Sequence, residues 1–84
     1  MTVTLRLFAA AREAAGCARA EFALDEARDI ESLMHAARAR FGSEFDAVLA
    51  TTRVWVNGDE PAAGEAASLH DGDEVAVLPP VSGG

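Results

Sequence analysis

The 84-residue sequence has few of the side chains that bind metals or form covalent cross-links. It contains one cysteine, Cys17, and two histidines, His35 and His70. A single cysteine excludes an internal disulfide and any site built from several thiolates. Two histidines so far apart do not match the ligand spacing of a zinc site. The sequence therefore predicts no metal site and no disulfide.

Lysine is absent, and all seven positively charged side chains are arginines. Composition is one explanation, because alanine- and arginine-rich chains often contain few lysines. A functional explanation is also open. If the C-terminal acyl group of the chain becomes activated, a chain without lysine has no ε-amine that would attack that group and cause self-conjugation.

Long apolar runs and an excess of positive charge are also missing. No apolar stretch approaches the roughly 20 residues that a membrane-spanning helix needs, and no basic leader precedes an apolar region. The net charge of −7 argues against nucleic-acid and anionic membrane partners. We therefore expect a cytoplasmic protein that docks on a more basic protein. Its length and its apolar content predict one small domain with a single core.

Alternating apolar residues predict a strand at the start of the chain. Residues 2–8 alternate strictly, which places Val3, Leu5 and Leu7 on the core side. Phe8 would face outward, where it interrupts a polar face, and it is a candidate interface residue. The segment from Ala9 to Ala15 favours a short helix, because alanine has the highest helix propensity.

Gly16 is a natural end for this helix. The next segment, Ala18 to Leu24, is predicted to be a second strand. Because the connection between the two strands is short, we expect them to pair antiparallel.

The longest helical pattern begins after Asp29, a good N-cap residue, and ends at Gly42. Apolar residues recur in it at helical spacing and form a stripe that faces the core. Ser43 is predicted to cap a shorter helix that reaches Leu49. This pattern predicts one main helix followed by a minor one.

Turn signals divide the last third of the chain. Arg53 to Val56 reads as a strand that ends at the Asn57-Gly58 turn, and Glu60 to Ala63 is a candidate short return strand. The loop that follows carries one apolar anchor, Leu69. Glu74 to Leu78 is the predicted last strand, with its two valines on the core side.

This order of elements predicts an α+β fold, in which one main helix packs across a mixed sheet of four to five strands. Helical crossovers favour parallel neighbours, so the first and last strands are expected side by side in the centre of the sheet. Phe8 and Leu78 would then share the outward face. We expect a folded domain over residues 1–78 and an extended tail over residues 79–84.

The tail has an unusual composition, Pro79-Pro80-Val81-Ser82-Gly83-Gly84. Neither proline can donate a ladder hydrogen bond, so the sheet should end at Leu78. Consecutive prolines favour an extended backbone that projects from the domain. The two glycines lack side chains, so the terminal carboxylate can enter a narrow channel. A disordered tail or a cloning scar is the alternative.

No catalytic constellation accompanies the tail. The sequence has no nucleophile elbow and no glycine-rich phosphate loop. Its acidic segment Asp71-Gly72-Asp73-Glu74 resembles part of a calcium loop but lacks the twelve-residue ligand pattern, and we interpret it as a turn. The chain is not expected to be an enzyme by itself, and the carboxylate of Gly84 remains as the predicted reacting group.

Three stretches resemble a known family. Residues 71–84, DGDEVAVLPPVSGG, resemble the C-terminal signature of the small subunit of molybdopterin synthase, the MoaD family. Residues 7–16, LFAAAREAAG, resemble its first strand and short helix, and Val56-Asn57 resembles its third strand and turn. Residues 17–52 match in pattern more than in identity. The resemblance implies a ubiquitin-like β-grasp fold, in agreement with the order of elements.

The resemblance also implies a sulfur carrier. An E1-like adenylating enzyme (MoeB type) would use ATP to convert the carboxylate of Gly84 to an acyl-adenylate. A sulfur donor, such as a cysteine desulfurase or a rhodanese, would then displace AMP and leave a thiocarboxylate. The tail would enter the large subunit of molybdopterin synthase (MoaE type), where the sulfur passes to cyclic pyranopterin monophosphate within a heterotetramer. The chain itself would bind no cofactor.

Carried over by position, the family pattern makes Gly84 the reacting residue and places the residues before it in the partner's channel, namely Val81, Ser82 and Gly83. It makes four residues docking contacts: Phe8, Leu78, Pro79 and Pro80. Three alternatives stay open. The chain could serve thiamine, cysteine or tRNA thiolation, act as a ubiquitin-like modifier of target lysines, or be an interaction module with an inert tail.

Overall fold

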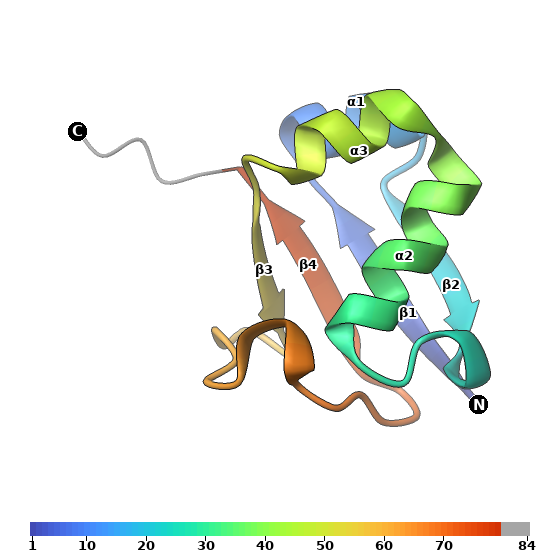
Figure 1. Ribbon diagram of the computed structural model, residues 1–84, viewed down its shortest axis with the longest axis vertical. Coiled ribbons are helices and arrows are strands. Elements are labelled where there is room, and N and C mark those ends of the chain that lie inside the picture. Colours follow the sequence, from blue (N-terminus) through green and yellow to red (C-terminus); the bar gives the residue numbers. More distant parts are fainter. Residues whose placement is uncertain (80–84) are drawn as a thin grey trace.

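A computed structural model describes residues 1–79 of the chain. Its centre is a four-stranded sheet with helix α2 packed across one face (Figure 1). The strands are β1 (Thr2–Leu7), β2 (Arg19–Ala23), β3 (Arg53–Val56) and β4 (Glu74–Leu78). The helices are α1 (Ala9–Ala15), α2 (Ile30–Phe41) and α3 (Ser43–Leu49). This arrangement confirms the predicted α+β fold with one main helix.

The strand order is β2-β1-β4-β3, so β1 and β4 lie in the centre. Strand β1 pairs antiparallel with β2 and parallel with β4, and β3 pairs antiparallel with β4. The prediction that the first and last strands are parallel neighbours is therefore confirmed. In this register Leu7 lies opposite Val77, which brings the ends of β1 and β4 to the same end of the sheet.

The core lies between the sheet and the helices. The inward side chains of β1 and β4 are no more than 1% exposed, which confirms the predicted alternation. Helix α2 covers them with the buried side chains of its apolar stripe, Ile30, Leu33, Met34 and Ala37. Each large apolar side chain buried in this core contributes roughly 1.5–3 kcal/mol to the free energy of folding.

The helix boundaries follow local capping chemistry. The backbone N–H of Ser32 donates to Asp29 Oδ1 over 2.8 Å, which confirms Asp29 as the N-cap of α2. This hydrogen bond lowers the pKa of Asp29. The predicted cap at Ser43 is wrong, because Ser43 is already helical and Gly42 precedes it with a φ of 95°. Gly42 thus ends α2 and starts α3 without a side-chain cap.

Two predicted strands are one residue too long at their C-terminal ends. Phe8 is the N-cap of α1 rather than the last residue of a strand, although its backbone is still extended. Leu24 begins a 3-10 turn, η1 (Leu24–Glu26).

The prediction of a return strand over Glu60 to Ala63 is wrong. Pro61 lacks an N–H to donate, and the chain turns into a second 3-10 turn, η2 (Gly64–Ala66), instead.

The predicted turn at Asn57-Gly58 is confirmed. Both residues have positive φ values, 50° and 87°. The type I′ turn that connects two strands through two residues requires such values. The N–H groups of Val56 and Asp59 donate to each other's carbonyl oxygens across it, over 2.8 and 3.0 Å. Leu69, the predicted anchor of the following loop, is 5% exposed.

Candidate functional site

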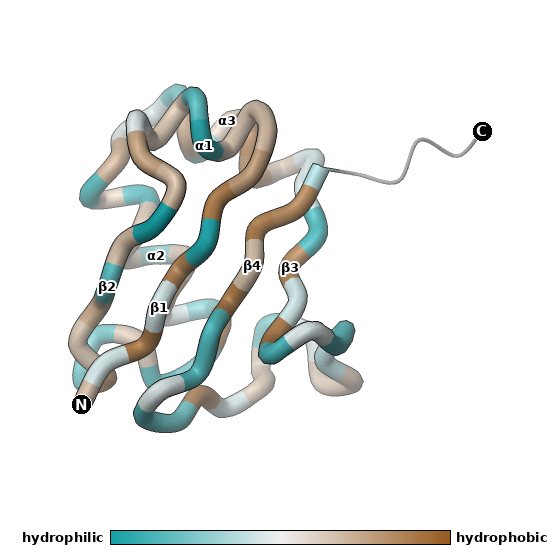
Figure 2. Tube along the Cα trace, turned by 180° about the vertical axis from the view of Figure 1, so that it is seen from behind, coloured by the Kyte–Doolittle hydropathy of each residue, from teal (hydrophilic) through white to brown (hydrophobic). Residues whose placement is uncertain are grey.

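One face of the sheet carries no helix among residues 1–79. Seen from behind, β1 and β4 lie in the foreground with helix α2 behind them (Figure 2). We call this surface the open face. Strand alternation and register assign twelve residues to it: Thr2, Thr4, Arg6, Phe8, Arg19, Glu21, Ala23, Arg53, Trp55, Glu74, Ala76 and Leu78.

The apolar part of the open face lies where the chain leaves the sheet. The N–H of Phe8 donates to the carbonyl oxygen of Val77 over 3.3 Å, so Phe8 continues the pairing of β1 and lies level with Leu78. Phe8 is 36% exposed, whereas Leu78 is half-buried. Pro79 follows directly and is exposed. The structure thus brings together three of the four predicted docking residues at the base of the tail.

Arg6 lies beside this apolar part and places a positive charge next to it. Its guanidinium carbon is 5.7 Å from the centre of the Phe8 ring, within reach of a cation–π contact. Arg6 Nη1 also lies 3.6 Å from Glu74 Oε1. Both partners of this ion pair are about half exposed, so it contributes at most about 1 kcal/mol to stability. The open face therefore combines an apolar end with a charged rim that solvent screens.

Trp55 adds an aromatic surface for which the sequence prediction had no role. It lies opposite Ala76 on the neighbouring strand β4 and is half-buried. Its indole Nε1 is buried and has no hydrogen-bond acceptor in the described part of the chain. The alternation in β3 was the signal that placed it, since Val54 and Val56 point to the core and Trp55 to the other side.

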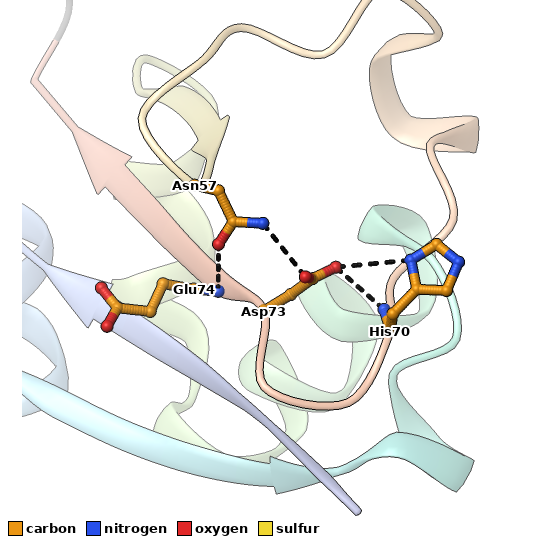
Figure 3. A network of polar contacts seen from close by, with 4 residues as sticks. All are labelled: Asn57, His70, Asp73 and Glu74. Carbon is orange, nitrogen blue, oxygen red and sulfur yellow. Dashed lines mark hydrogen bonds and ion pairs between the residues drawn. The ribbon is translucent and has the colours of Figure 1, made fainter.

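The opposite end of the sheet is held by a network of polar contacts (Figure 3). Asn57 Nδ2 donates to Asp73 Oδ1 over 3.0 Å, and Asn57 Oδ1 accepts from the N–H of Glu74 over 2.9 Å. The N–H of His70 donates to Asp73 Oδ2 over 2.9 Å, and His70 Nδ1 lies 3.6 Å from the same oxygen. We call this set of four residues the polar clamp. It joins β3 to β4 at the end farthest from the tail.

The carboxyl group of Asp73 is the centre of the polar clamp. Partial burial acts to raise its pKa, and the hydrogen bonds from Asn57 and His70 outweigh that effect, so the pKa of Asp73 is lowered. Asp71 is used in a similar way, since its Oδ1 accepts from the N–H of Thr2 over 2.9 Å. Both carboxylates accept hydrogen bonds from other residues of the chain, which agrees with the interpretation of residues 71–74 as a turn.

Nothing in residues 1–79 resembles a catalytic centre. Within that range no group of three or more His, Cys, Asp or Glu side chains is arranged to hold a metal ion. Cys17 is a free, half-buried thiol packed against the core. The described helices include none that is long and apolar enough to cross a membrane.

The predicted reacting part of the chain lies outside the described residues. It comprises Pro80, Val81, Ser82, Gly83 and Gly84. The division into a domain over residues 1–78 and a tail over residues 79–84 stays a prediction, as do the roles given to those five residues.

Comparison with known proteins identifies relatives over the whole chain. The model of the ThiS family matches residues 5–84. The molybdopterin synthase sulfur carrier subunit of Chlamydomonas reinhardtii is 33% identical over 84 residues, which cover 100% of both chains. The match therefore includes the tail.

Solved structures agree with this match. Molybdopterin converting factor subunit 1 of Pyrococcus furiosus superposes with a TM-score of 0.83 at 27% identity, covering 96% of this chain and 99% of that one. SAMP1 of Haloferax volcanii superposes with a TM-score of 0.75 at 25% identity, covering 100% of both chains.

A third structure shows the same fold at lower identity. It is the complex of subunits 1 and 2 of the molybdopterin-converting factor of Helicobacter pylori, with a TM-score of 0.74, 24% identity and 100% coverage of both chains. Together the family match and the full-length relative assign the chain. It belongs to the ThiS family and is a sulfur carrier of the MoaD type with a ubiquitin-like β-grasp fold.

Proposed function

We propose that this chain is the sulfur-carrier subunit of a molybdopterin synthase and that the carboxylate of Gly84 carries the sulfur. The observation that carries the proposal is the 33% identity to a subunit of that name over 100% of both chains. The Pyrococcus furiosus structure, named as a molybdopterin converting factor subunit, supports the same pathway.

The proposed chemistry takes place on the terminal carboxylate. A free carboxylate is a poor electrophile, so an adenylating enzyme (MoeB type) joins it to the AMP part of ATP, and pyrophosphate leaves. The persulfide of a cysteine desulfurase or a rhodanese then displaces AMP and forms an acyl disulfide with Gly84, and a thiol reductant cleaves the S–S bond of this disulfide. The resulting thiocarboxylate of Gly84 donates its sulfur to cyclic pyranopterin monophosphate. ATP is consumed by the activating enzyme, so this chain needs no bound cofactor.

The open face is the proposed docking surface for the large subunit (MoaE type). Phe8, Leu78 and Pro79 lie together at the base of the tail, and Pro80 follows them in sequence. Burial of each large apolar side chain would contribute roughly 1.5–3 kcal/mol to binding, offset by the cost of ordering the interface. The Helicobacter pylori relative is named as a complex of two subunits, which supports a heteromeric assembly. We place this assembly in the cytoplasm.

The proposal is tested by the intact mass of the chain after incubation with the adenylating enzyme, ATP and a sulfur donor. We expect the mass to rise by the difference between the atomic masses of sulfur and oxygen, because one sulfur atom replaces one oxygen atom. Deletion of Gly84 should abolish that gain, whereas Glu13→Gln on the exposed side of α1 should retain it. If the wild-type mass stays unchanged under these conditions, the chain is not a sulfur carrier for this pathway.

A second measurement separates the synthase subunit from a sibling carrier that serves thiamine, cysteine or tRNA thiolation. The thiocarboxylate form is mixed with the large subunit and cyclic pyranopterin monophosphate, and molybdopterin is measured. We expect formation of molybdopterin. A chain that gains sulfur but forms no molybdopterin with an active large subunit would belong to another thiolation pathway.

A ubiquitin-like modifier is the second candidate, because SAMP1, the small archaeal modifier protein 1 of Haloferax volcanii, is 25% identical over the full length of both chains. A modifier would form higher-mass conjugates with other proteins in cells. The chain has no lysine and its last arginine is Arg53, so trypsin would leave residues 54–84 on a target lysine. Cleavage after Glu74 by a glutamate-specific protease would leave the shorter remnant 75–84, which is better suited to mass spectrometry.

A further inference from the structure

The sheet has two edge strands, β2 and β3. Among residues 1–79, a side chain of helix α2 covers the edge of β2, and none donates to the free backbone groups of β3. On β2, Arg40 Nη1 of helix α2 donates to the carbonyl oxygen of Glu21 over 3.0 Å. The same guanidinium group lies 3.8 Å from the centre of the Phe22 ring. A charged side chain that covers an edge strand in this way opposes pairing with another strand.

The edge of β3 is open at one residue. The N–H of Asn57 donates to the carbonyl oxygen of Glu74. Hydrogen-bonded pairs alternate in an antiparallel ladder, so Val54 and Val56 direct their N–H and C=O groups away from β4. Val56 uses both groups in the turn with Asp59. The two groups of Val54 have no partner within residues 1–79.

A groove with apolar and charged residues in its lining lies beside this open edge, on the helix side of the sheet. Its volume is about 420 Å³, enough to receive a large apolar side chain. Buried residues of α2, Ile30 and Met34, form part of its lining, and Leu49, Val54 and Pro61 add further apolar surface. Free backbone groups and an adjacent groove that can receive a side chain are the two features that an added strand requires.

The groove lining contains three charged side chains, two of which are in ion pairs, and the third is acidic. Arg38 is engaged by Asp46 over 2.8 Å, and Glu60 lies 3.6 Å from Arg53. Glu65 also lines the groove and is exposed, and it has no ion-pair partner in the described part of the chain. The net charge of the whole chain is −7. A second copy would bring the same acidic groups to the edge, so the charge favours a different, basic partner.

We propose that the edge of β3 at Val54 binds one extended strand of a different protein, with an apolar side chain at the residue opposite Val54 and basic residues on either side. The proposal does not depend on which pathway receives the sulfur.

The hydrogen bonds of the β3 turn limit the length of this contact. Because Val56 is engaged by Asp59, the incoming strand cannot continue past Val54 in that direction. The contact is therefore short and centred on one residue. The partner residue opposite Val54 directs its side chain into the groove, and its neighbours lie on the open face beside Arg53 and Trp55.

The test uses the full-length, isotope-labelled chain and a blocked heptapeptide as the probe. The peptide has leucine at its centre, threonine around it and lysine at both ends. At millimolar peptide we expect slower hydrogen exchange at the N–H of Val54. The N–H of Val56, which is already bonded, serves as the internal control. A matched peptide with glutamate at both ends should bind roughly fivefold more weakly, the effect expected when one surface ion pair with Glu65 is replaced by repulsion.

Two charge variants sharpen this test. Glu65→Lys should remove or reverse the preference for the lysine peptide, whereas Glu13→Lys on α1 should leave it unchanged. Unchanged exchange at Val54, or equal binding of a peptide with glycine at its centre, would overturn the proposal. Protection of Val54 on self-association, measured together with sedimentation as a dimer, would also overturn it in favour of a second copy as the occupant.

Discussion

The two faces of the sheet differ although the same strands build both. In β1, Val3, Leu5 and Leu7 are no more than 1% exposed, whereas Arg6 between them is exposed to solvent. The inner face packs on α2, and the open face carries Arg6, Phe8 and charged neighbours. The difference shows that residues important for stability and residues available for binding alternate along one strand. A substitution can therefore change one of these properties without the other.

The largest expected effect is on the inner face. Leu5→Ala removes a fully buried side chain and leaves a cavity beneath α2. We expect the free energy of unfolding to fall by about 3–4 kcal/mol, measured by chemical denaturation. Thr4→Ala on the neighbouring position of the open face should change it by less than about 1 kcal/mol. Similar losses for the two variants would contradict the assignment of the faces.

A smaller effect is expected at the polar clamp, which holds the end of the sheet opposite the tail. Asp73→Asn removes the charge that accepts hydrogen bonds from Asn57 and His70. We expect it to lower the free energy of unfolding at neutral pH by about 1 kcal/mol. Asp25→Asn, at an exposed carboxyl group, should have little effect. Equal stability of the two variants at neutral pH would exclude a stabilising role for the Asp73 charge.

The same variant should change the dependence of stability on pH. The pKa of Asp73 is lower in the folded chain than its ordinary value, so the carboxylate stabilises the fold above about pH 4 and loses this effect as the pH falls further. Wild type should therefore lose its advantage over Asp73→Asn in acid. An advantage that persists at about pH 2 would show that it does not arise from the charge.

The smallest effect on stability, and a large effect on binding, is expected for Phe8→Ala on the open face. Phe8 is 36% exposed, so the free energy of unfolding should change by less than about 1 kcal/mol. The dissociation constant with the large synthase subunit should rise about tenfold or more, because the apolar contact is lost. Calorimetry measures this, and His35→Ala on the exposed side of α2 is the control. Equal dissociation constants for both variants would remove Phe8 from the interface.

Much of the local structure followed from the sequence because neighbouring residues determine it. Alternation in Thr2–Leu7 and Glu74–Leu78 encodes which side chains are buried, since successive side chains of a strand point to opposite faces. Asp29 starts α2 through a hydrogen bond to a residue three positions away. The Asn57-Gly58 turn needs positive φ values that this dipeptide tolerates. Periodicity and capping act within a few residues, so the sequence alone revealed them.

The tertiary structure decided features that depend on distant pairing. The order of elements predicted that Phe8 and Leu78 share a face, and the register of β1 and β4, some 70 residues apart, placed the two residues level with each other. The tertiary structure joined Asn57 to Asp73. It also left Glu60 to Ala63 outside the sheet, which exposes the edge at Val54. No local pattern encodes these contacts, since each arises only when the whole sheet has formed. The sequence by itself thus determined which residues face the core, and the assembled sheet decided which surfaces remain open for a partner.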